Sequence, residues 1–198
     1  MALGLTITRW AGAILAILIA VMSYRFLFLP LEPAYPAMLG HIAERPTLLM
    51  AHIIAASIAL GFGVFQFSTR LRARRPAIHR AMGRVYVAAV LVAALSGIGI
   101  GWAAPGGIAA QSGFVLLALL WLGTTGMAVW HIKARRISAH RRWMVRSFTL
   151  TFAAVTLRLQ LPFFEIFAQM QYDPASNWVA WACWVPNLMV AEWWLRRR

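Results

Sequence analysis

Residues 73–102 read ARRPAIHRAMGRVYVAAVLVAALSGIGIGW, a basic octet that leads directly into an apolar stretch long enough to cross a membrane. The octet recurs as ARRISAHR at residues 134–141, and there too an apolar stretch follows it. Both copies have the pattern A-R-R-x-x-x-H-R, and equivalent residues are 61 positions apart. Each copy therefore places one histidine, His79 or His140, at the start of a long apolar segment.

The composition of the chain is that of an integral membrane protein. Apolar residues make up 62% of the 198 residues, charged residues make up 12%, and the mean hydropathy is +0.70. A net charge of +14 would favour nucleic acid in a soluble protein, but here the arginines lie between apolar segments and form no continuous face. We therefore expect membrane lipids, and not nucleic acid, as the partners of these cations. The single cysteine, Cys183, excludes an intramolecular disulfide.

Six stretches of about 20 mostly apolar residues meet the length that a membrane-spanning helix requires. Turn-forming sequences rich in proline, glycine and arginine separate them. The sequence therefore predicts an all-α polytopic membrane protein with a single integral membrane domain over residues 1–198. The six predicted transmembrane helices cover approximately residues 10–29, 47–68, 81–104, 108–131, 143–166 and 178–195.

The distribution of Lys and Arg predicts that both termini lie in the cytoplasm. Short cytoplasmic loops carry an excess of these residues, and this orientation places 16 of the 19 cations on the cytoplasmic side. A cleaved signal peptide is the alternative interpretation of the first apolar segment, but that segment continues through YRFLFL without a good cleavage site. The cytoplasmic cations are Arg9, Arg70, Arg72, Arg74, Arg75, Arg80, Arg84, Lys133, Arg135, Arg136, Arg141, Arg142, Arg146, Arg196, Arg197 and Arg198.

The two octets occupy the predicted cytoplasmic loops between helices two and three and between helices four and five. An offset of 61 residues superposes helix two on helix four and helix three on helix five, in matching directions. This pattern predicts a duplicated helical hairpin with a pseudo-two-fold axis along the membrane normal. Alternatively, the two loops are rich in arginine only because short cytoplasmic loops in general carry an excess of Lys and Arg. In a central four-helix bundle of helices two to five, the duplication places helices three and five on a diagonal.

His79 and His140 would then face each other across the inner end of the bundle. Two neutral imidazoles that converge from diagonal helices are the ligand set of one b-type haem, whose iron both would coordinate. Two other interpretations stay open: each histidine caps the membrane interface through backbone or lipid phosphate, or the pair binds another metal or ligand. In the haem interpretation, four arginines are candidates to pair with the propionates: Arg80, Arg84, Arg142 and Arg146.

A second group of polar residues lies near the predicted outer face. Arg158 falls within a predicted span, and an intramembrane cation is a functional hypothesis by default. Glu165 follows it on nearly the same helical face, while His52, Gln111 and Gln160 lie at comparable depth. These five residues are candidates to bind a quinone headgroup, a small anion or a lipid. The structural alternative is that Arg158 fixes helix packing by pairing with a glutamate, for which the candidates are Glu32, Glu44 and Glu165.

Prolines, tryptophans and glycines predict features of individual helices. Pro162 and Pro186 are expected to kink or end the last two helices. Trp121 and Trp184 lie deep in their predicted spans and are expected to pack internally. The small residues of ALSGIGIGWAAPGG predict close contact between helices and not a ligand site.

Three stretches resemble the bacterial predicted membrane proteins of the domain-of-unknown-function family DUF2306. They are HRAMGRVYVAAVLVAALSGIGIG from His79, GFVLLALLWLGTTGMAVWHIKARR from Gly113 and HRRWMVRSFTLTFAAVTLRLQLP from His140. The resemblance covers about residues 47–162 and implies a multi-span protein of the bacterial inner membrane, with no particular activity. The positions that match the family pattern are His52, His79, Arg84, His140, Arg146 and Arg158; His41 and His131 are not part of it.

The hairpin arrangement is also similar to that of dihaem cytochromes of the b561 type, as an analogy of architecture. The sequence departs from that pattern because His52 has no histidine partner on helix four, where Gln111 and Ser112 are the nearest candidates. One bis-histidine haem is therefore the most that the sequence supports. Two functional hypotheses follow: a quinone-linked redox protein with one haem b, or a protein that binds or transports a small molecule or lipid. A third is an accessory subunit of a membrane complex.

Overall fold

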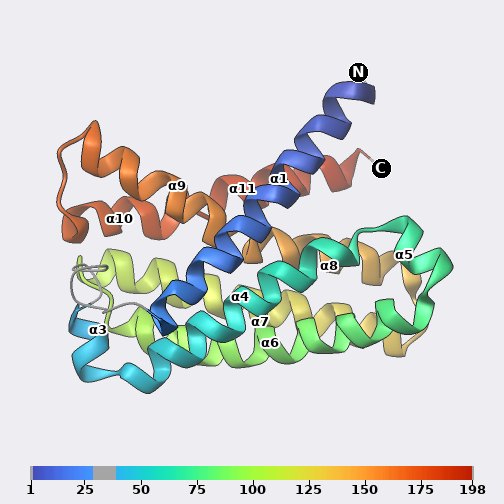
Figure 1. Ribbon diagram of the computed structural model, residues 1–198, viewed down its shortest axis with the longest axis horizontal. Helices are drawn as coiled ribbons and strands as arrows, with labels where there is room; N and C mark the ends of the chain where they lie inside the picture. The colour runs from blue at the N-terminus through green and yellow to red at the C-terminus, as the bar shows by residue number, and fades with distance from the viewer. Residues whose placement is uncertain (1, 29–38, 198) are drawn as a thin grey trace.

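The computed structural model describes residues 2–28 and 39–197 and shows helices throughout these ranges (Figure 1). Neither range contains a β-strand, so the predicted all-α class is confirmed for the described chain. The elements in chain order are α1 (Ala2–Ser23), η1 (Tyr24–Leu27), α3 (Leu39–Glu44), α4 (Pro46–Gln66), α5 (Thr69–Arg74), α6 (Pro76–Trp102), α7 (Ile108–Lys133), α8 (Ile137–Thr151), α9 (Ala153–Ile166), α10 (Tyr172–Ala182) and α11 (Val185–Arg196).

Four helical segments of the described chain are long and apolar enough to cross a membrane. They are α4, α6, α7 and the pair α8 and α9, which together cover Ile137–Ile166. The first and last predicted spans differ from these four. Within α1, residues Trp10–Ser23 form a shorter apolar helix, and the last predicted span is divided between α10 and α11. The total of six spans therefore stays a prediction.

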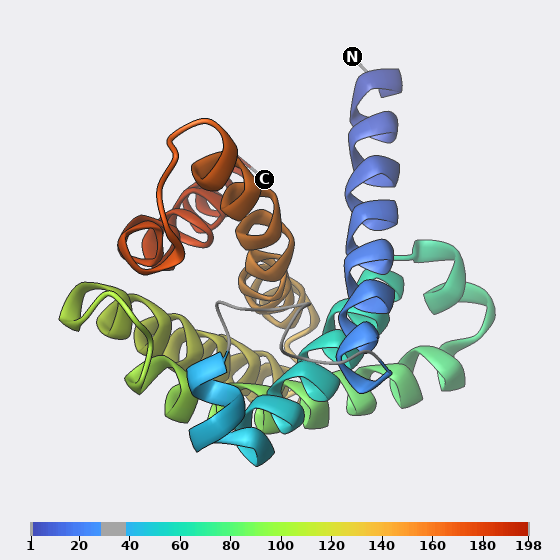
Figure 2. The ribbon, with the colours of Figure 1, turned by 60° about the vertical axis from the view of Figure 1, so that its left-hand side comes forward.

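Helices α4, α6, α7 and α8 form a four-helix bundle (Figures 1 and 2). Each helix packs against the next in this order, and α8 packs back against α4, so α6 and α8 lie on a diagonal. The shared core contains Ala59 of α4, Val90 of α6, Trp121 of α7 and Leu150 of α8, all of them buried. This is the helix order that a duplicated hairpin predicts.

The two octets adopt the same local structure. Helices α6 and α8 begin at equivalent positions of the 61-residue repeat, directly after the second arginine of each octet. The carbonyl of that arginine accepts the backbone N–H of the histidine in both copies: Arg75 from His79 at 3.1 Å, and Arg136 from His140 at 2.9 Å. Each histidine therefore lies in the first turn of its helix.

A hydrogen bond across the bundle supports the pseudo-two-fold axis. Tyr86 of α6 and Ser147 of α8 are 61 residues apart, and their hydroxyl oxygens are 2.7 Å apart. Residues at equivalent positions of a duplication can touch only close to the axis that relates the two copies. In a duplicated hairpin, this contact would place the axis between α6 and α8, the two helices that carry His79 and His140.

The remaining long helices cover the bundle. Helix α1 packs against α4 and α9, where Ala16 and Ala20 meet Leu60 and Val155 in a buried apolar cluster. Helix α10 packs against α7 and α9, and α11 packs against α8. The α8 and α9 segments meet at Phe152, which lies in a turn between the two helices.

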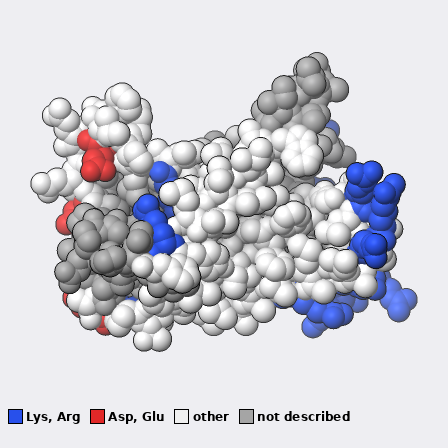
Figure 3. Space-filling view, viewed as in Figure 1, with Lys and Arg blue, Asp and Glu red and all other residues white. Residues whose placement is uncertain are grey.

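Charged side chains separate toward the two ends of the molecule (Figure 3). On the face shown, most Lys and Arg gather at the end that holds α5 and the turn between α7 and α8, and a smaller group lies beside the acidic end. Asp and Glu lie toward the opposite end, near α3 and the turn between α9 and α10. The surface between the two ends is largely uncharged, as a belt in contact with lipid tails requires.

Candidate functional site

His79 and His140 lie near each other at the cationic end of the bundle. His79 interacts electrostatically with His140, as well as with Arg72 and Arg80. The backbone of α7 orients the ring of His140, because its Nδ1 atom lies 2.9 Å from the carbonyl oxygen of Ala128. A carbonyl only accepts hydrogen bonds, so we assign the proton to Nδ1, which leaves a lone pair on Nε2. The free Nε2 atom of His140 is therefore available to bind a ligand.

The two histidines differ in hydrogen bonding because the repeat is imperfect. The Nδ1 atom of His79 is enclosed and has no hydrogen-bond partner among the described residues. The position equivalent to Ala128 is Phe67, which lies just beyond the end of α4, whereas α7 continues well past Ala128. Only His140 therefore has a helical carbonyl beside its ring.

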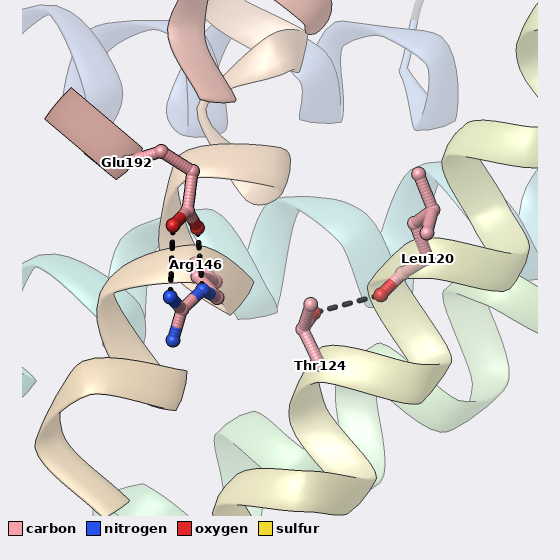
Figure 4. Close-up of polar contacts among 4 residues, drawn as sticks. All are labelled: Leu120, Thr124, Arg146 and Glu192. Atoms are coloured by element: carbon pink, nitrogen blue, oxygen red, sulfur yellow. Dashed lines mark hydrogen bonds and ion pairs between the residues drawn. The ribbon is translucent and has the colours of Figure 1, made fainter. Parts of the chain in front are cut away.

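Arg146, one of the four predicted propionate partners, pairs with a carboxylate of the protein itself. Its Nε and Nη2 atoms donate to the two carboxylate oxygens of Glu192 on α11, at 2.5 and 2.9 Å (Figure 4). Its guanidinium also lies over the ring of Trp143, 4.6 Å from the ring centroid. This ion pair ties α11 to α8, and the sequence did not predict it. The other three candidate arginines, Arg80, Arg84 and Arg142, are exposed.

A network of buried hydroxyl groups lies about two helical turns from the histidines. Tyr86 is hydrogen-bonded to Ser147 and Thr151 at 2.7 and 2.8 Å, and Thr125 is hydrogen-bonded to Ser147 at 2.7 Å. The indole of Trp121 donates to Thr151 at 2.9 Å. The network joins α6, α7 and α8, and interhelical hydrogen bonds of this kind stabilise membrane bundles and fix their register.

Sequence reasoning missed this network. Its signal is a set of hydroxyl residues inside long apolar helices, of which two are 61 positions apart. A hydroxyl residue alone is not sufficient: Thr124, beside Thr125, donates to the Leu120 carbonyl of its own helix at 2.8 Å (Figure 4). Only the packing of three helices distinguishes the two threonines.

His52 and Arg158 are two members of the second predicted cluster, and each is held by hydrogen bonds to other residues. The Nδ1 atom of His52 donates to the carbonyl of Ala93 on α6 at 2.7 Å. Gly97, one turn later, leaves room for the ring, because a Cβ atom there would lie 3.1 Å from Nδ1. Arg158 of α9 interacts electrostatically with His52 and donates to the hydroxyl of Ser23 on α1 at 2.9 Å.

None of the described glutamates pairs with Arg158. Glu165 is exposed at the end of α9, and Glu44 pairs with a neighbouring arginine. Glu32 lies outside the described residues. The side chain of Gln111 forms no hydrogen bond with any described residue either. Of the predicted cluster, His52 and Arg158 are therefore within electrostatic reach of each other, whereas Arg158 forms no ion pair with Glu165.

Gln160, the fifth member of the predicted cluster, stabilises a break in the last helical segment. Pro186 has no N–H and cannot bond the carbonyl of Ala182, four residues earlier. The side chain of Gln160 donates to that carbonyl at 3.1 Å. The next carbonyl along the chain likewise accepts hydrogen bonds from side chains, those of Thr156 and Asn187. Irregular backbone is tolerated inside a membrane where the protein satisfies it in this way.

Replacing Gln160 with leucine is expected to lower the free energy of unfolding by about 1 to 3 kcal/mol, because the Ala182 carbonyl loses its donor. The loss should be smaller in a Pro186→Ala background, where the backbone N–H can supply the missing bond. Thermal unfolding of the wild type, both single variants and the double variant in one detergent measures this coupling. Strictly additive losses would contradict the assigned role of Gln160.

The fold and these two clusters define a polytopic helical membrane protein with two histidines near one end of its bundle and a half-buried arginine toward the other. Within that class, residues 49–195 match the family described as predicted membrane protein DUF2306. The chain therefore belongs to this family, which confirms the resemblance seen in the sequence. No curated protein and no solved structure shows significant similarity to the chain.

Proposed function

We propose that this protein is a redox protein of the bacterial inner membrane that holds one b-type haem between His79 and His140. The observation that carries the proposal is the placement of these two histidines at equivalent positions on the diagonal helices α6 and α8, within electrostatic reach of each other. A b-type haem would supply one-electron transfer at this end of the bundle.

The side chains around the pair fit this group. The proton of His140 is fixed on Nδ1 by a backbone carbonyl, the support that metal-bound histidines usually have. His79 has an enclosed ring nitrogen without a protein partner among the described residues. Arg80, Arg84 and Arg142 are exposed at the same end and are the candidates to pair with the propionates. Arg146 would instead act indirectly, by holding α11 against α8.

The proposal includes the orientation of the chain. Six spans, with both termini and the cationic end in the cytoplasm, would form a single membrane domain. In this arrangement the divided segment α10 and α11 completes the sixth span, and α1 provides the first.

A reduced-minus-oxidised absorption spectrum tests the proposal. The full chain is purified in mild detergent from cells supplied with a haem precursor, and haem is quantified against protein. We expect a sharp b-type alpha band and one haem per chain. A preparation of folded protein without this band would refute the haem proposal.

A further inference from the structure

We propose that His52 and Arg158 form a binding site for the headgroup of a lipid-soluble quinol. The proposal extends the redox function proposed above, but the binding itself does not depend on haem. His52 lies on α4 of the bundle and Arg158 lies on α9, and neither residue takes part in the proposed haem site.

Arg158 provides fixed hydrogen-bond donors in an apolar setting. Its Nη1 and Nη2 atoms donate to the carbonyl of Ala154 and the hydroxyl of Ser23, at 3.1 and 2.9 Å. A guanidinium has five N–H groups, and the hydrogen bonds of Arg158 to described residues use two of them. No described carboxylate pairs with Arg158, and a half-buried cation without a carboxylate favours a ligand with oxygen acceptors.

His52 provides the complementary acceptor. Its Nδ1 atom donates to the Ala93 carbonyl, so Nε2 carries the lone pair, and Nε2 has no hydrogen-bond partner among the described residues. The ring position is fixed by this bond and by the space above Gly97. His52 lies on α4 and Arg158 on α9, and helix α1, whose Ser23 accepts a hydrogen bond from Arg158, packs against both of these helices. The donor group and the acceptor group are within electrostatic reach of each other.

A quinol headgroup matches this pair. Its oxygens accept hydrogen bonds from a guanidinium, its O–H groups donate to an imidazole nitrogen, and its apolar ring and tail reach the site through the lipid phase. The phosphate diester of a phospholipid offers only acceptors, so it would leave Nε2 of His52 unpaired. The site should therefore bind a quinol more tightly than the corresponding quinone, which has no O–H group.

The test measures binding of decylubiquinol and decylubiquinone, under anaerobic conditions, to the full chain in nanodiscs of phosphatidylcholine. We expect Arg158→Met to weaken quinol binding about tenfold or more, because one side of the headgroup loses its donors. His52→Phe should abolish the preference for quinol over quinone. Arg158→Lys, which keeps a donor, should retain measurable binding. Arg141→Met, which removes an exposed arginine in the first turns of α8, serves as the control expected to bind like the wild type.

Three results would overturn the proposal. The first is an unchanged quinol affinity in folded Arg158→Met and folded His52→Phe protein. The second is a preference of the wild type for quinone over quinol, and the third is Arg158-dependent binding of phosphatidylglycerol in place of quinol. Repeating the measurement on His79→Ala protein separates this proposal from the haem proposal. Quinol binding that persists in His79→Ala protein supports the quinol site formed by His52 and Arg158, whether or not haem is bound. A haem spectrum without Arg158-dependent quinol binding refutes the quinol site and leaves the haem proposal standing.

Discussion

Replacing either His79 or His140 with alanine is expected to abolish the b-type absorption band of the purified protein. Each histidine would supply one of the two ligands of the iron in the proposed site, and among the described side chains His140 is the one histidine that interacts with His79. Haem content per folded chain, measured after gel filtration, gives the result directly. A variant that lacks haem but elutes like the wild type separates loss of the ligand from loss of the fold.

His131 provides a matched control for this experiment. It is a buried histidine on α7, and like His79 it has an enclosed Nδ1 atom with no described partner. Because it is not an interaction partner of His79, His131→Ala should keep the haem. Loss of haem in His131→Ala together with full retention in His140→Ala would show that the wrong pair was assigned.

Trp121→Ala is expected to produce the largest loss of stability, about 3 to 5 kcal/mol, because the change empties a buried site in the shared core. The substitution also removes the indole donor to Thr151, at the centre of the hydroxyl network. Thermal unfolding in a single detergent, followed by loss of the monodisperse peak, measures the effect.

Trp102→Ala is the control for this second prediction. Trp102 lies at the end of α6 and is 71% exposed, so its removal leaves no cavity and should change the free energy of unfolding by less than about 1 kcal/mol. Similar losses for Trp121→Ala and Trp102→Ala would mean that the network and the core around Trp121 do not hold the bundle together.

The sequence predicted the helical architecture well because the signals are local. Long apolar segments and the repeated octets identified α4, α6, α7 and the α8–α9 segment, and Pro186 marked the break before α11. The diagonal placement of α6 and α8 also followed, because a duplicated hairpin leaves few ways to order four helices.

The side-chain partners were less predictable because they depend on how distant segments pack. Arg158 and Glu165 share a helical face in a regular helix, but Pro162 lies between them in α9, and Glu165 is exposed. Arg158 donates instead to Ser23, which is 135 residues away in the chain. The ion pair of Arg146 and Glu192 likewise joins two helices that no local pattern connects.

The electron paramagnetic resonance spectrum of the oxidised wild-type protein tests the central claim most directly, because it reports both axial ligands of a haem at once. Coordination by His79 and His140 predicts a low-spin ferric signal typical of two imidazole ligands, with one haem per chain. A high-spin signal from five-coordinate iron, or folded protein without any haem signal, would contradict the proposed pairing of the two histidines.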